Sequence, residues 1–139
     1  MTSKKTRRFD EVRPGESLPD LAIPITVALV ASGAIATRDY FPGHHDLQAA
    51  RELGSPHIFM NILTTSGLAQ RYVEAWAGPL ACFKDLKIKL GAPNYPGDTM
   101  TFSGEVLATD PARRTVDVAL KGKNSMGNHV TGTATLVLP

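Results

Sequence analysis

Two side chains in the segment DYFPGHHD, residues 39–46, have the types and spacing that proton transfer to or from water requires. Asp39 and His44 lie on either side of a turn that Pro42 and Gly43 favour. Such a turn allows both side chains to reach one water molecule. Histidine titrates near neutral pH, so His44 is suited to accept a proton from that water.

The same segment has two other interpretations. Asp39 and His44 could simply bind backbone groups of the loop, as aspartate often does in turns, and spacing alone favours this interpretation over catalysis. His45 and Asp46 invite a metal-binding interpretation, but adjacent side chains usually point apart and no third ligand cluster exists. We therefore predict no metal site, with His45 as local structure and Asp46 as a helix cap.

The strongest helical pattern covers residues 62–76 and should lie against a sheet. Its apolar or small side chains form one stripe, made of Ile62, Leu63, Ser66, Ala69, Tyr72, Val73 and Trp76. Tyr72 and Trp76 are expected in the core or an interface rather than around substrate. Gly67 costs about 1 kcal/mol relative to alanine inside a helix, so we expect it to allow close packing.

The rest of the chain indicates mostly strands. A strand is expected at residues 21–30 and a short helix, capped by Asp46 and ended by Gly54, at residues 47–54. Four successive antiparallel strands should follow the long helix, at residues 86–90, 99–109, 115–123 and 129–138. Within these ranges apolar and polar residues alternate, and turn-forming residues separate one range from the next. A sheet curled around one apolar helix satisfies this pattern, so the predicted fold class is α+β.

Length and charge indicate one domain, residues 9–139, behind a basic flexible tail, residues 1–8. Without the tail the chain has eleven basic and thirteen acidic residues, which argues against nucleic-acid binding. No stretch approaches the roughly 20 apolar residues of a membrane helix, and no apolar stretch follows the basic start. We expect a cytoplasmic protein that does not bind membranes.

Cys82 is the only cysteine, so the chain cannot form an intrachain disulfide or a thiolate metal cage by itself. Its apolar neighbours predict a small, buried side chain rather than a catalytic thiol.

Two motifs go further than these patterns: TRDYFPGHHD at residues 37–46 and LGAPNYPGDTMTFSGEV at residues 90–106. They resemble the MaoC-like branch of the hotdog superfamily, whose (R)-specific enoyl-CoA hydratases carry D-x-N-P-x-H before the central helix and A-P-V-Y-P-G-D-T-L after it. The resemblance runs in order from about Phe9 to Leu138. It implies a hotdog fold, a curled antiparallel sheet around one long central helix, and addition of water across the 2,3 double bond of an enoyl-CoA thioester.

Within this family, ATRDYFPGHHD, FMNILTTSGLAQRYVEAWAGP and DTMTFSGEV look like the small MaoC-like subunit of the hydratases that act on steroid side-chain CoA thioesters. In that group the small subunit carries the catalytic pair and its partner has its own hotdog domain. The resemblance implies an acyl-CoA thioester substrate and no separate cofactor, because coenzyme A is part of the substrate. It also implies a homodimer or a heteromer with a second MaoC-like hotdog subunit.

The resemblance assigns Asp39 and His44 as the catalytic pair, and leaves open which is acid or base. The family has His-Gly where this sequence has Met60 and Asn61. A backbone N–H survives any replacement except proline, so the N–H groups of Asn61 and Ile62 are expected to bind the thioester oxygen.

The same resemblance suggests five substrate-binding residues. Phe41 stands where the family motif has asparagine. Lys87 and Lys89 are candidates for the coenzyme A phosphates, although a solvated strand face explains them as well. Pro93 and Gly97 should shape the wall along which the pantetheine runs.

Two alternative functions stay open. A hotdog thioesterase usually places an acid on or near the central helix, and residues 62–70 contain none. A non-catalytic hotdog subunit would complete a partner's acyl-CoA site, but it would have no chemical need for both Asp39 and His44.

Overall fold

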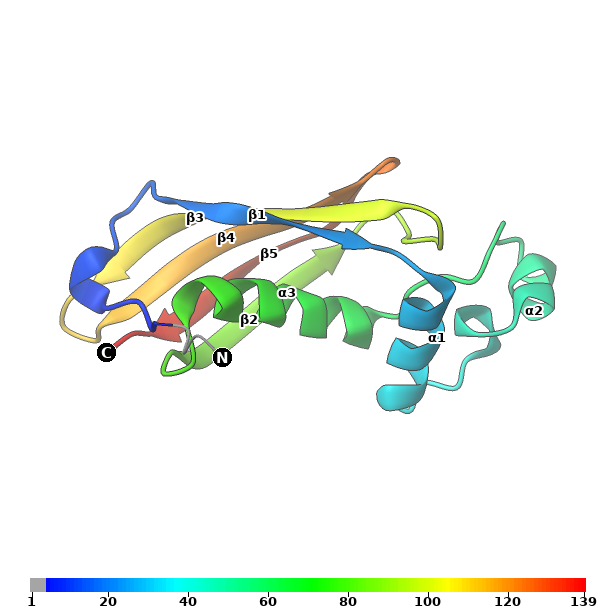
Figure 1. Ribbon diagram of the computed structural model, residues 1–139, viewed down its shortest axis with the longest axis horizontal. Coiled ribbons are helices and arrows are strands. Elements are labelled where there is room, and N and C mark those ends of the chain that lie inside the picture. The colour runs from blue at the N-terminus through cyan, green and yellow to red at the C-terminus, as the bar shows by residue number, and fades with distance from the viewer. Residues whose placement is uncertain (1–4) are drawn as a thin grey trace.

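The computed structural model describes residues 5–139 as one antiparallel sheet with helices on one face and at one end (Figure 1). The strand order is β1-β3-β4-β5-β2, so β1 and β2 form the two edges. The strands are β1 Ser17–Pro24, β2 Cys82–Leu90, β3 Thr99–Asp110, β4 Thr115–Asn124 and β5 Gly127–Val137. The helices are η1 Phe9–Glu11, α1 Val27–Ala36, η2 Pro42–His44, α2 Leu47–Glu52 and α3 Ile62–Ala77.

The core lies between helix α3 and the inner face of the sheet. Successive side chains of β3, β4 and β5 point to opposite faces of the sheet, so every second one points inward. The inward side chains include the fully buried Met100, Phe102, Val118 and Leu136. Full burial of a side chain of this size contributes about 1.5–3 kcal/mol. Tyr72 of α3 stacks on Phe102 with ring centroids 5.2 Å apart, and Trp76 is also buried. The α+β arrangement and the core positions of Tyr72 and Trp76 are confirmed.

The buried face of α3 differs from the predicted stripe. Ile62 and Leu63 are each 50% exposed, whereas Thr64 and Thr65 are buried. Thr65 faces inward because its hydroxyl bonds to the Asn61 carbonyl and to His129, and Thr64 faces inward because it packs against Gly33 of α1; a hydrophobicity pattern detects neither contact. Gly67 is exposed, and a Cβ placed there would contact no other element of the described chain within 4 Å, so our expectation of close packing was wrong.

The close helix approach occurs instead at Gly33 of α1. A Cβ on Gly33 would overlap the side chain of Thr64, so glycine allows α1 to rest closely on α3. This contact places the C-terminal end of α1 beside the N-terminal end of α3.

The predicted strand at residues 21–30 was wrong in its second half. The strand β1 ends at Pro24, and helix α1 begins three residues later, at Val27, behind Thr26, whose hydroxyl accepts a hydrogen bond from the Leu29 N–H at 3.0 Å. A continuous apolar run cannot distinguish a strand from a helix, and here the cap and the alanine-rich sequence decide.

Several other local predictions hold. Asp46 caps α2 by accepting from the Ala49 N–H at 3.1 Å, and Gly54 after the helix has φ +86°. Along β2, Leu86 and Ile88 pack against the core and Lys87 is exposed. Cys82 is an exception: it is exposed rather than buried, because it begins an edge strand that has a neighbour on one side only.

The packed structure begins before the predicted domain boundary at Phe9. Residues 1–4 of the predicted tail lie outside the described residues. Arg7, within that tail, donates its backbone N–H to Ala77, forms an ion pair with Glu16 at 2.6 Å and lies 5.3 Å from the Trp76 ring centroid. Within residues 5–139, no helix is long and apolar enough to cross a membrane.

Candidate active site

The segment between α1 and α2, which contains Asp39 and His44, lies at the end of the molecule where α1 packs against α3 (Figure 1). Helix α1 ends at Ala36, and Arg38 then takes a left-handed conformation, φ +56°, that turns the chain. The Asp39 N–H still donates to the Ala34 carbonyl at 2.9 Å, which ties the new segment to the helix. The turn at η2 then brings His44 back toward Asp39.

The two side chains face one another. His44 Nε2 lies 3.4 Å from Asp39 Oδ2, with the His44 side chain 9% exposed and the Asp39 side chain 29% exposed. His44 Nδ1 lies 2.6 Å from the Phe59 carbonyl oxygen. Because a carbonyl only accepts hydrogen bonds, Nδ1 must carry the hydrogen. In the neutral ring, Nε2 is therefore the nitrogen with the free lone pair, and it points at the carboxylate.

Asp39 is held as a carboxylate. Asn61 Nδ2 donates to Asp39 Oδ2 at 3.0 Å, and this hydrogen bond lowers the pKa of Asp39 below its ordinary value. Partial burial opposes this effect, while the Phe41 N–H and the nearby His44 lower the pKa further. Asp39 is consequently ionised at neutral pH.

A carboxylate and the free lone pair of a neutral imidazole cannot hydrogen-bond to each other, because both are acceptors. A water molecule lying beside both atoms can donate one hydrogen to each. Asp39 and His44 can thus orient a water and accept its proton, which is general-base chemistry.

The start of α3 lies directly beside this pair. Asn61 is the helix cap, and its Oδ1 accepts from the Thr64 N–H at 3.0 Å. Among residues 5–139, the backbone N–H groups of Asn61 and Ile62 have no hydrogen-bond acceptor. They stand at the positive end of the helix, where they are available to an anionic oxygen.

Aromatic rings enclose His44. The ring centroid of Phe41 lies 5.4 Å from that of His44, and the Phe59 centroid lies 4.8 Å from it, both in edge-to-face orientations. Phe41 is itself 45% exposed, so it forms an accessible wall beside the catalytic candidates.

The remaining predicted substrate-binding residues divide into two groups. Pro93 and Gly97 lie in the loop between β2 and β3, which is joined to the start of α3 by the Met60 N–H donating to the Asn94 carbonyl at 3.1 Å. Lys87 and Lys89 are not brought to Asp39 and His44.

Both lysines project from the outer face of the sheet, opposite α3. Their cross-strand neighbours on β5 are Thr133 and Thr131, which alternate with the buried Ala134 and Val130. Lys87 also forms an ion pair with Asp85 at 3.1 Å.

Sequence reasoning missed three supporting groups: the Asn61 amide, the Thr37 hydroxyl and the Phe59 carbonyl. Thr37 Oγ1 accepts from Asn61 Nδ2 at 2.9 Å. An asparagine before a helical pattern signals a cap. No sequence signal reveals its contact with Asp39, 22 positions away.

A second buried histidine ties three elements together near the site. His129 is 3% exposed; its Nδ1 lies 2.7 Å from the Ala92 carbonyl oxygen and its Nε2 lies 2.8 Å from Thr65 Oγ1. Burial lowers the pKa of His129 below its ordinary value and outweighs the hydrogen bond to Ala92.

This burial predicts a pH-dependent stability. Above about pH 6.5 His129 is neutral in both folded and unfolded chains; below it, the unfolded chain binds the proton more readily. The free energy of unfolding should therefore fall as the pH decreases from 7 to 5, by at most about 1.4 kcal/mol per pH unit from this group. Urea unfolding of the His129→Gln variant should show a shallower pH dependence than the wild type. The exposed His45→Gln variant is the control, and an equal slope in all three proteins would contradict the prediction.

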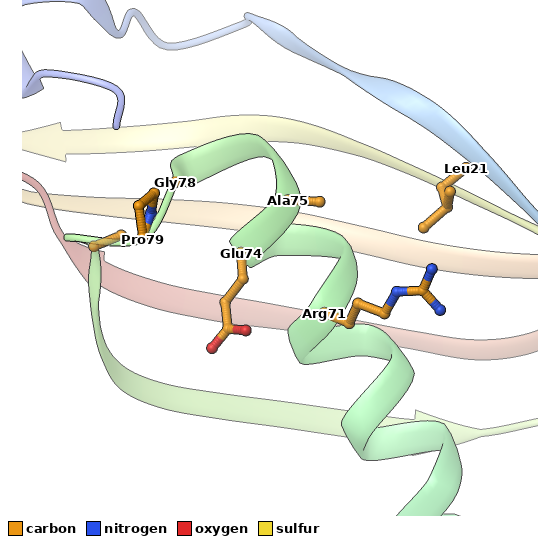
Figure 2. Close-up of a pocket in the computed structure, with 7 residues that line it drawn as sticks. Leu21, Arg71, Glu74, Ala75, Gly78 and Pro79 are labelled. Atoms are coloured by element: carbon orange, nitrogen blue, oxygen red, sulfur yellow. The ribbon is translucent and has the colours of Figure 1, made fainter. Parts of the chain in front are cut away.

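An open groove of about 620 Å³ lies at the opposite end of α3 (Figure 2). Arg71 extends toward Leu21 of β1, whereas Glu74 points away from it. The groove is lined by Leu21, Arg71, Glu74, Ala75, Gly78, Pro79 and Ala81. The groove and the Asp39–His44 pair are therefore separate features.

Comparison with known proteins shows the family of this chain. The family model described as a MaoC-like domain matches residues 10–127. The chain belongs to the MaoC-like family. Over 122 residues it is 48% identical to the 3-oxo-4,17-pregnadiene-20-carboxyl-CoA hydratase beta subunit of Mycobacterium tuberculosis, covering 88% of this chain and 93% of that protein.

Solved structures confirm the hotdog fold. The crystal structure of the ChsH1–ChsH2 complex from M. tuberculosis contains a chain that is 44% identical, with a TM-score of 0.88, over 91% of this chain and 98% of that chain. The R-hydratase PhaJ1 of Pseudomonas aeruginosa is 20% identical, with a TM-score of 0.87, over 95% of this chain and 85% of its own, and shows the fold alone.

Proposed function

We propose that this chain is the small, catalytic subunit of an enoyl-CoA hydratase, a lyase that adds water across the 2,3 double bond of the thioester. The observation that carries this proposal is the facing pair of acceptors, His44 Nε2 and Asp39 Oδ2, 3.4 Å apart beside the start of α3. The 48% identity to a steroid-CoA hydratase subunit supports the same reaction type.

In the proposed reaction, Asp39 orients a water and His44 Nε2 removes its proton as the water oxygen bonds to the β-carbon. The π electrons of the double bond then form a bond between the α-carbon and the carbonyl carbon, and the carbonyl π electrons move to the thioester oxygen, where the N–H groups of Asn61 and Ile62 stabilise the enolate. The enolate then takes the proton from His44 at the α-carbon. The negative charge of Asp39 stabilises the imidazolium formed between these two steps.

We further propose a heteromer with a second MaoC-like hotdog subunit and a bulky, steroid-like acyl group on the substrate. The matched crystal structure is itself a complex of two named subunits, and the similar hydratase subunit is named for a steroid side-chain thioester. Exposed apolar side chains near the site, including Tyr40 at 65% and Ile35 at 58%, provide surface that a partner or a large acyl group can cover.

The test uses the purified chain, alone and mixed with the ChsH2 subunit of M. tuberculosis, with light scattering to measure assembly. Loss of the conjugated enoyl-thioester absorbance is followed with crotonyl-CoA and with 3-oxo-4,17-pregnadiene-20-carboxyl-CoA. We expect hydration of the steroid thioester, faster in the mixture. A stable complex without hydration would instead indicate a non-catalytic subunit.

Release of free coenzyme A in the same assay would indicate a thioesterase. The structure offers this alternative no acid on α3 near the site. Glu74 is the first acidic residue of that helix, and it lines the groove at the opposite end.

A further inference from the structure

The side chain of Asn61 is buried, 2% exposed, and forms hydrogen bonds in three directions. Its Nδ2 donates one hydrogen to Asp39 Oδ2 at 3.0 Å and the other to Thr37 Oγ1 at 2.9 Å. Its Oδ1 accepts from the Thr64 N–H at 3.0 Å. One amide thus joins the end of α1, the proposed catalytic loop and the first turn of α3.

These partners permit only one orientation of the amide. If the group were rotated by half a turn, Oδ1 would face the Asp39 carboxylate and Nδ2 would face the Thr64 N–H. The first contact would be repulsive and the second would join two donors. The Asn61 Nδ2 group is therefore held toward Asp39 by the helix itself.

The position of Thr37 strengthens this arrangement. Its hydroxyl donates to the Gly33 carbonyl at 2.7 Å, so it offers a lone pair to Asn61. Gly33 is also where α1 rests against Thr64 of α3. The two helices therefore hold Asn61 from both sides.

We propose that the Asn61 side chain is a positioning residue for the hydration reaction, which orients the Asp39 carboxylate beside His44 while it caps α3. The inference rests on the proposed function. The backbone N–H of the same residue is a proposed donor to the thioester oxygen. Asn61 therefore fixes the position of the proton-transfer pair relative to the oxyanion site. Displacement of a reacting group by about 1 Å costs on the order of 100-fold in rate. A shift of Asp39 relative to the oxyanion site should therefore lower the rate of hydration strongly.

Two substitutions separate positioning from capping. Asn61→Ser and Asn61→Asp both retain an oxygen that can cap the helix, but neither has an N–H donor for Asp39. Each is assayed in the assembly state, alone or with ChsH2, in which the wild-type chain is active. Circular dichroism and thermal unfolding check that each variant is folded.

For Asn61→Ser we expect kcat to fall about 10- to 100-fold with KM changed less than about threefold. Asn61→Asp places a second carboxylate beside Asp39, and like charges favour protonation. The acidic limb of its profile of kcat/KM against pH should therefore move to higher pH. A residue that only caps α3 would leave kcat of the Asn61→Ser variant unchanged.

Failure of the inference and failure of the proposed function give different results. A folded Asn61→Ser variant with wild-type kcat overturns the positioning role, provided that Asp39→Asn is inactive. Activity of Asp39→Asn at the wild-type level overturns the proposed function itself. If Asn61→Asp does not fold, the Asn61→Ser variant decides.

Discussion

Replacement of His44 by alanine should reduce kcat for hydration of the enoyl-CoA thioester by about 10³-fold, within the range that a positioned general base contributes. The substitution removes the one imidazole lone pair that faces Asp39 across 3.4 Å. It also removes the hydrogen bond to the Phe59 carbonyl, which holds the ring in the tautomer with a free Nε2. The measurement is the initial rate of loss of enoyl-thioester absorbance under saturating substrate.

The neighbouring His45 supplies a matched control. It is exposed, and its ring contacts the Tyr40 carbonyl at 3.2 Å rather than Asp39. His45→Ala should therefore keep the wild-type rate. A folded His44→Ala variant that also keeps the wild-type rate would exclude His44 as the base.

The second large effect is expected for Asp39→Asn, with kcat reduced about 10²- to 10³-fold. The substitution preserves the size of the side chain and removes the negative charge that stabilises the imidazolium of His44. It also introduces an amide N–H that can donate to His44 Nε2 and occupy the lone pair needed for water. Steady-state rates near pH 7.5 measure the effect, because the lowered pKa of Asp39 leaves the wild-type carboxyl ionised there.

Asp46→Asn is the corresponding control. Asp46 caps α2 through the Ala49 N–H, and asparagine caps a helix about as well as aspartate. This variant should retain both stability and turnover. Equal losses of kcat in Asp39→Asn and Asp46→Asn would show that turnover depends on the total negative charge of the loop and that the Asp39 carboxylate has no particular role.

The geometry also limits what coenzyme A can contact on this chain. Lys87 and Lys89 project from the outer face of the sheet, while Asp39 and His44 lie at the end of the helical side. Within one copy of the described chain, the two lysines and the Asp39–His44 pair therefore lie on different faces. Phe41 and the loop that contains Pro93 and Gly97 remain the substrate-binding candidates near the reaction centre.

The sequence alone was sufficient for the features that local interactions control. The α3 helix, the β3–β4 turn and the Asp46 cap depend on residues within a few positions of one another, so their periodicity and capping residues predict them. The two motifs indicated the hotdog family because they span both sides of the central helix. The α+β arrangement followed, since an apolar helix must be covered by the inner face of a sheet.

The tertiary structure decided the features that depend on distant residues. His44 takes its tautomer from Phe59, 15 positions away; Asp39 takes its orientation from Asn61, 22 positions away; and Thr65 meets His129 across 64 positions. Each contact depends on how α1, α3 and the sheet pack together, and hydrophobic periodicity carries no record of that packing. The same reason accounts for the exposed Cys82 and for the inward threonines of α3. In this protein, local sequence determines the elements and the chemical groups, whereas long-range packing determines which groups meet.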